Sequence, residues 1–148
     1  MWKARDTVFE KHANRLLTRL LFDFRAIPGK VSVAFKDCSI RFLEHVQIRV
    51  DLDFMHRGDL NLQLTAPSGT VSPMTGMRPM DSRLAFRNLT DWHITTVFHW
   101  GESPEGTWEL SVEDFDKQTV TSGNFLCWTL LIFRICRTGL VEARRTRM

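Results

Sequence analysis

The sequence lacks an apolar run long enough to cross a bilayer, which takes roughly 18 to 20 residues. Its longest apolar stretch, Leu126–Phe133, has the length of a buried strand. Charged residues also interrupt residues 1–15, so no apolar core of a secretory signal is visible there. We therefore expect a soluble chain with no transmembrane segment, and its first residues give no sign of secretion.

Cysteine is scarce in this sequence. Cys38, Cys127 and Cys136 are its three cysteines, and no two of them form the close CxxC pair of a metal or redox site. An odd number allows at most one internal disulfide. The sequence leaves open which two cysteines would form it.

Positive charge is lacking in the centre of the chain. The net charge is +3, yet residues 31–133 contain eight Lys and Arg against thirteen Asp and Glu. Basic groups are concentrated in residues 1–30 and 134–148 instead. The centre therefore offers no cationic face for phosphates, and we expect no nucleic-acid partner.

Apolar residues are plentiful. They make up 43% of the 148 residues and include 11 Phe and 5 Trp, which suffices for one core and one domain. From Val46 to Phe54 apolar and polar residues alternate, which predicts a half-buried strand. Leu60–Leu64 resumes the alternation after Gly58, so we expect these two runs to form an antiparallel pair.

Two further turns are expected. Residues 66–70 read Ala-Pro-Ser-Gly-Thr, which predicts a turn before a strand near Val71. Ile94–Phe98 and the alternating Trp108–Val112 flank a Gly- and Pro-containing turn at 101–106. This pattern predicts another hairpin.

The segment before these strands has a different period. Between Asp6 and Phe24 apolar residues recur at three- and four-residue steps, which predicts one amphipathic helix packed on the following domain. Pro28-Gly29 would end it. A helix lying on an anionic membrane surface is the weaker alternative.

Short strands separated by turns dominate the rest. Phe125–Phe133 is nearly continuous in apolar residues, as in the middle strand of a sandwich. The pattern predicts an all-β jelly-roll β-sandwich. We divide the chain into an N-terminal helix and linker (1–30), the β domain (31–133) and a basic tail expected to be disordered (134–148).

Several specific motifs stand within residues 31–133. They are Leu43-Glu44-His45-Val46, Arg57-Gly58-Asp59-Leu60, Pro67-Ser68-Gly69-Thr70, Arg78-Pro79 with Asp81, Trp92, Thr95-Thr96-Val97, and the run from Trp100 to Leu110. Together they resemble one known family, the P domain (Homo B domain) of kexin- and furin-like proprotein convertases. The last motif is the most specific.

The resemblance implies a galactose-binding-like jelly roll of about eight strands that packs in cis on a subtilisin-like catalytic domain. In that family the P domain stabilises the protease, influences its calcium and pH dependence, and works in the secretory pathway, in the Golgi or outside the cell. Calcium would belong to the catalytic domain, and no cofactor is expected in this chain. Trp100 and Pro104 are the candidate inter-domain contacts.

Catalysis by the chain itself is not expected. A subtilisin-like protease needs Ser, His and Asp, each in its own local motif, and neither His-Gly-Thr nor Gly-Thr-Ser occurs here. We therefore interpret the chain as a non-catalytic part of a serine-endopeptidase family. A hydrolase with an unrecognised triad is the weaker alternative.

Three other groups of residues are candidate sites, each with an ordinary structural explanation beside it. Arg57-Gly58-Asp59 spells an adhesion tripeptide in a turn, so a free-standing adhesion or carbohydrate-binding module using it or an exposed Trp is the alternative function. Asn88-Leu89-Thr90 is a glycosylation sequon. The weak calcium candidates are Asp51, Asp53, Asp114 and Asp116, although alternation makes the first two ordinary solvated side chains.

Overall fold

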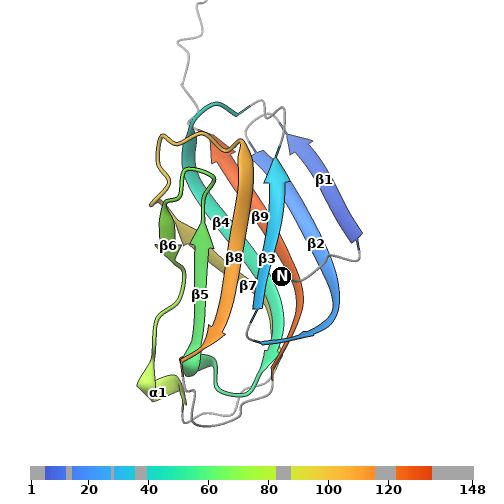
Figure 1. Cartoon of the computed structure of the whole chain (residues 1–148), viewed down its shortest axis with the longest axis vertical. Coiled ribbons are helices and arrows are strands. Elements are labelled where there is room, and N and C mark those ends of the chain that lie inside the picture. Colours follow the sequence, from blue (N-terminus) through green and yellow to red (C-terminus); the bar gives the residue numbers. More distant parts are fainter. Residues whose placement is uncertain are drawn as a thin grey trace, which may run out of the picture.

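The computed structural model describes residues 6–12, 15–27, 29–35, 40–82, 88–115 and 123–134, which form two antiparallel sheets (Figure 1). One sheet has five strands in the order β1-β2-β9-β4-β7 and the other has four in the order β3-β8-β5-β6. The prediction of an all-β sandwich is confirmed. The five-stranded sheet consists of β1 (Asp6–His12), β2 (Arg15–Ala26), β9 (Gly123–Arg134), β4 (Leu43–Phe54) and β7 (Leu89–Thr96).

The other secondary-structure elements are a four-stranded sheet and two short helical turns. The strands are β3 (Gly29–Phe35), β8 (Gly106–Asp114), β5 (Leu60–Thr65) and β6 (Val71–Pro73). The turns are η1 (Arg57–Asp59) and α1 (Pro79–Ser82).

Buried residues from both sheets build the core between them, and their alternation is clearest in β4. In β4 every second residue from Val46 to Phe54 is buried, as a period of two requires when one face of a sheet is covered. Trp108 of β8 and Trp128 of β9 are both fully buried. Both indoles belong to the core, and the prediction that 125–133 forms a middle strand of the sandwich is confirmed.

The predicted N-terminal helix is wrong, because Asp6–His12 and Arg15–Ala26 form the strands β1 and β2. β2 pairs with β9 from Arg15 opposite Phe133 to Ala26 opposite Asn124, with one irregularity between Leu21 and Arg25. A stretch with adjacent apolar residues suits a strand as well as a helix. Hydrogen bonding to the central strand β9 favours the strand over the helix. This pairing is a tertiary effect, which local periodicity does not predict.

Both predicted pairings of successive strands are also wrong. β4 lies between β9 and β7 in one sheet, whereas β5 lies between β8 and β6 in the other, so η1 carries the chain across the sandwich. The 97–105 loop likewise crosses from β7 to β8. Alternation tells which face of a strand is buried but not which strand is its neighbour.

The turn at residues 66–70 is as predicted. It joins β5 to β6, which pair antiparallel from Thr65 opposite Val71 to Gln63 opposite Pro73. Gly69 N donates to Ala66 O at 2.9 Å, and Gly69 has a φ of +91° that favours glycine.

The loops gather at two ends of the sandwich, and Figure 1 shows α1 at one end and the β5–β6 turn at the other. We call the end with residues 40–43, 66–70 and 97–105 the Trp100 end. The end with residues 55–59, 74–82 and 88–92 is called the Arg57 end. The candidate sites described below lie mainly at these two ends.

Candidate functional sites

Exposed apolar side chains mark the Trp100 end. Phe42, Val97, Phe98 and Trp100, here called the Trp100 rim, have between 58% and 61% of their surface exposed. Gly101 N donates to Leu43 O at 2.8 Å and Leu43 N donates to Glu102 O at 3.0 Å. These bonds hold the segment that carries Phe42 beside the one that carries Trp100.

A polar network centred on Glu102 supports this loop. Its carboxylate accepts hydrogen bonds from Ser68 Oγ at 2.7 Å and Thr70 Oγ1 at 2.6 Å, which ties the 97–105 loop to the β5–β6 turn. Burial acts to raise the pKa of Glu102, but the hydrogen bonds from Thr70 and Ser68 and the nearby His99 outweigh it and hold that pKa below its ordinary value. The carboxyl group of Glu102 is therefore ionised in this network.

His99 connects this network to the core. The side chain is 1% exposed and meets Trp108 edge to face, with ring centroids 5.1 Å apart. Its Nδ1 lies 3.6 Å from Glu102 Oε2, too far for a good hydrogen bond but close enough for charge attraction. Burial lowers the pKa of His99, and the attraction of Glu102 opposes this only in part.

Ser68, Glu102 and His99 do not form a catalytic triad. A triad needs the histidine between the hydroxyl and the carboxylate, whereas here Ser68 donates directly to Glu102. His99 is also buried. The arrangement suits a loop anchor and not an activated nucleophile.

The two candidate inter-domain contacts, Trp100 and Pro104, differ in exposure. Trp100 is 58% exposed. Pro104 is buried within this chain, and its carbonyl oxygen accepts a hydrogen bond from Trp108 Nε1 at 3.0 Å. Trp100 is therefore on the surface, while Pro104 fixes the loop from inside.

The adhesion-like tripeptide lies at the Arg57 end as the short turn η1. Gly58 is buried, and its carbonyl accepts a hydrogen bond from Arg78 N at 2.8 Å. Asp59 O accepts one from Phe115 N at 2.7 Å, and Arg57 Nη2 contacts Asp81 Oδ1 at 3.3 Å. These contacts give the tripeptide a structural role and do not present it as a projecting hairpin tip.

The described calcium candidates Asp51, Asp53 and Asp114 belong to no metal-binding group. Asp51 Oδ1 accepts a hydrogen bond from Asp91 N at 2.6 Å, which links β4 to β7. Asp53 lies further along β4, Asp114 ends β8, and Asp116 lies outside the described residues. Within the described part of the chain, no group of three or more His, Cys, Asp or Glu could hold a metal ion.

Asn88 is exposed at the start of β7, at the Arg57 end. It has a φ of +64°, in the left-handed region that Asn tolerates better than most residues. Thr90 of the same sequon is also exposed.

Of the cysteines, Cys127 is buried in β9. Cys38 and Cys136 lie outside the described residues.

Sequence reasoning missed His99, Glu102 and Arg78 as parts of sites. Glu102 and Arg78 stand within motifs that carried the family resemblance, and His99 directly precedes one of them. Their partners, however, are distant in the sequence. No spacing rule predicts that Glu102 meets Ser68 and Thr70 across the end of a sandwich.

Comparisons with known proteins agree with this architecture. Residues 43–132 match the family described as Proprotein convertase P-domain. Endoprotease bli-4 of Caenorhabditis elegans is 39% identical over 94 residues, which cover 64% of this chain and 10% of that protein. Proprotein convertase subtilisin/kexin type 6 of Rattus norvegicus is 35% identical over 119 residues, covering 76% and 12% respectively.

A solved structure shows the same fold. The serine protease of Aeromonas sobria superposes with a TM-score of 0.62 at 19% sequence identity, covering 80% of this chain and 27% of that one. The fold and loops thus define an all-β sandwich module that matches one part of much longer proteins.

The chain belongs to the proprotein convertase P-domain family, because the match covers residues 43–132 of its 148. The convertases that contain this domain are subtilisin-like serine proteases. The chain spans about a tenth of the length of the curated relatives named above. Among the described residues, no helix has the length and apolar character needed to cross a membrane.

Proposed function

We propose that this chain is a non-catalytic P domain that stabilises and regulates a subtilisin-like catalytic domain, and that it docks through the Trp100 rim. The observation that carries this proposal is the exposure of four apolar side chains, three of them in one loop. Aromatic residues, Trp above all, contribute most of the binding free energy at many interfaces. Isolated exposed apolar residues need no explanation, but a group of them on one loop does.

The hydrogen bonds that hold the rim in place also support docking. The Glu102 network and the Trp108–Pro104 hydrogen bond fix the 97–105 loop before any partner arrives. A preorganised loop loses less conformational entropy on binding than a mobile one. The rim therefore suits a lasting contact between two domains.

We further propose that the chain hydrolyses no peptide itself and that bond cleavage belongs to the catalytic domain. The geometry of Ser68, Glu102 and His99 supports this, as does the absence of the triad motifs from the sequence. Incubating the purified chain with a dibasic peptide tests it. Turnover that a serine-reactive probe abolishes would contradict the proposal.

We also propose that the domain works in the secretory pathway, as its convertase relatives do, and that Asn88 is then glycosylated. Asn88 and Thr90 are both exposed, which a transferase requires. Secretion from animal cells should yield a product whose mass falls on treatment with a glycosidase. Asn88→Gln should remove that mass difference, while Asn61→Gln, outside a sequon, should not.

Docking is best tested in a chimera. The P domain of proprotein convertase subtilisin/kexin type 6 is replaced by this chain, and secreted protease activity is measured. Trp100→Ala and Phe98→Ala together should lower the yield of active protease several-fold. The matched control is Met80→Ala at the Arg57 end, where an 80% exposed side chain is removed. Equal yields from all chimeras would refute docking through the rim.

A further inference from the structure

Methionine is concentrated at the Arg57 end. Of the six methionines in the sequence, two are its first and last residues, and the other four lie in the loops of this end. One of them, Met55, precedes η1. The other three recur at every third residue of the segment that leaves β6 and enters α1, and we call them the methionine triplet: Met74, Met77 and Met80.

The triplet carries its sulfur atoms from the core out to solvent. Met80 is 80% exposed and Met77 is 59% exposed, while Met74 packs partly against the core. The sulfur of Met74 lies 3.6 Å from Ser72 Oγ. A thioether is a weak hydrogen-bond acceptor, so this contact is easily exchanged for a stronger ligand. Open space adjoins the triplet, since a Cβ placed on Gly76 would meet nothing within 4 Å.

Backbone hydrogen bonds hold the segment on both sides of its centre. Met74 N donates to Leu62 O at 2.8 Å, and Arg78 N donates to Gly58 O at 2.8 Å. Asp81 N then donates to Arg78 O at 2.8 Å and closes a turn around the third methionine. The flexible side chains therefore extend from a backbone that is already fixed, which reduces the entropy lost when they converge on a ligand.

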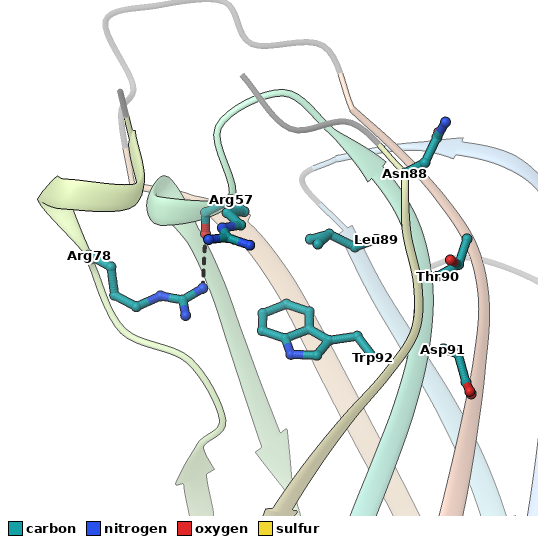
Figure 2. Close-up of a pocket in the computed structure, with 7 residues that line it drawn as sticks. All are labelled: Arg57, Arg78, Asn88, Leu89, Thr90, Asp91 and Trp92. Carbon is teal, nitrogen blue, oxygen red and sulfur yellow. Dashed lines mark hydrogen bonds between the residues drawn. The ribbon is translucent and has the colours of Figure 1, made fainter. Parts of the chain in front are cut away.

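The arginines of this end line a separate pocket. Figure 2 shows the side chains of Arg57 and Arg78 beside Leu89 and Trp92, around a pocket of about 340 Å³. A β-bulge, where the register of β7 with β4 shifts, gives Leu89 and Trp92 a common wall. The guanidinium carbon of Arg78 lies 5.7 Å from the centre of the Trp92 ring. The two exposed methionines do not line this pocket, so they and the guanidinium groups occupy different surfaces.

The chemistry of the triplet favours a soft metal ion. Thioether sulfur is a soft ligand that selects Cu(I), whereas Ca²⁺ and Mg²⁺ prefer oxygen. Thioethers are also neutral, so they suit an ion of low charge and need no excess charge from their neighbours. Within the described part of the chain, no group of three or more His, Cys, Asp or Glu offers a competing site.

We propose that Met74, Met77 and Met80 together bind Cu(I) through their thioether sulfurs. Met77 and Met80 supply ligands from the solvent side, and Met74 supplies one from the base. The site lies at the opposite end of the sandwich from the Trp100 rim, so this inference stands without the docking proposed there.

Nuclear magnetic resonance of the full chain, labelled with ¹³C in the methionine methyl groups, tests the proposal. The probe is Ag(I), a redox-inert ion with the charge and ligand preference of Cu(I), in chloride-free buffer. Cys38→Ser and Cys136→Ser remove competing thiols, and Cys127 is buried. We expect the three methyl signals of the triplet to shift saturably, and that of Met55 to stay in place. Zn(II) and Ca(II) should shift none of them.

Substitution by leucine keeps the apolar volume of methionine and removes the sulfur. Loss of a group that merely supports a metal ligand usually weakens affinity ten- to a hundredfold, so Met77→Leu and Met80→Leu should each weaken Ag(I) binding at least about tenfold. The double variant should lose saturable binding. Met55→Leu is the matched control at the same end and should leave the affinity unchanged. Competition with a chromophoric Cu(I) chelator should rank the variants in the same order.

Melting curves identify a variant that fails to fold, and if the double variant does so the two single variants decide. The proposal is overturned if the Met55 signal shifts as much as those of the triplet, if Zn(II) produces the same shifts, or if no signal saturates at millimolar Ag(I). Binding by the folded leucine variants that equals binding by the unaltered chain would also overturn it.

Discussion

The two ends of the sandwich are built from the same strands yet have opposite chemistry. At the Trp100 end the charged group is inside, where Glu102 lies under an exposed aromatic loop. At the Arg57 end the order is reversed: Leu89 and Trp92 pack inward, and with Arg57 and Arg78 they line a pocket of about 340 Å³. The first end therefore presents apolar side chains to solvent, and the second presents guanidinium groups.

This difference originates in the loops and not in the strands. β4, β8 and β9 run between the two ends and contribute buried side chains to one shared core along their length. The connections instead determine which groups are presented, as is general for scaffolds that carry sites on loops. Variants can therefore separate the two ends if the core beneath them is left intact.

The largest expected effect comes from removing the core beneath the Trp100 end. Trp108→Ala should lower the free energy of unfolding by about 3–5 kcal/mol, because it deletes a fully buried indole and leaves a cavity. It also removes the hydrogen bond to Pro104 O and the contact with His99. Denaturant unfolding followed by circular dichroism measures the change.

The matched control for that experiment is Trp100→Ala, which removes the same side chain from the surface. Its effect on stability should be below about 1 kcal/mol, since exposed positions away from special contacts tolerate change. Similar losses from both variants would mean that the rim is part of the core, and the contrast between inside and outside at this end would fail.

The next effect concerns how closely the loops pack at the Trp100 end. Gly106 has a φ of +122°, and a Cβ placed on it would lie 2.7 Å from Pro67 Cβ. Gly106→Ala should therefore destabilise the fold by about 2–3 kcal/mol through backbone strain and overpacking. Gly76→Ala is the control, because nothing lies within 4 Å of its added Cβ. A thermal melt in which both variants match the unaltered chain would show that Pro67 moves freely.

The sequence predicted the strands of the core but not their partners. Alternation identified β4, β5 and β8, because burial on one face of a strand is a local property. The sequence pattern wrongly paired β4 with β5 and predicted one helix where β1 and β2 lie, because strand neighbours are set by contacts distant in the sequence.

The candidate sites were likewise predictable only where they depend on local sequence. Trp100 was identified from a family motif, and its exposure is read directly from the structure. The bulge at Asp91 that brings Leu89 and Trp92 together depends on their pairing with β4. The sequence of β7 alone therefore gives no sign of the pocket.

A smaller effect is expected from the ion pairs of the Arg57 end. Asp81→Asn should destabilise the chain by about 1–2 kcal/mol, since it leaves two adjacent guanidinium groups without their shared, half-buried carboxylate. Chemical unfolding at low and high salt measures this, and salt should reduce the difference. Glu109→Gln breaks the exposed Lys30 pair and should have a clearly smaller effect. If Asp81→Asn cost no more than this control, the Arg57 end would be an ordinary solvated surface.

The smallest effect concerns pH and sharpens the contrast at the Trp100 end. Burial lowers the pKa of His99, so the unfolded chain binds its proton more readily than the folded chain does. Stability should therefore fall as pH drops below about 6.5, the ordinary pKa of histidine, and continue to fall until the lower folded pKa is passed. Glu102 stays ionised across this range because its own pKa is lowered.

His99→Phe keeps an aromatic ring against Trp108 and removes the titration. Lowering the pH from about 6.5 to 5.5 should then reduce the free energy of unfolding less than it does in the unaltered chain. The two chains should differ in this reduction by less than about 1 kcal/mol. His93→Phe, at an exposed position on β7, is the control for general effects of removing a histidine. An unaltered slope in His99→Phe would mean that the attraction of Glu102 fully offsets the burial of the imidazole. The Trp100 end would then lack the acid sensitivity that its buried polar network implies.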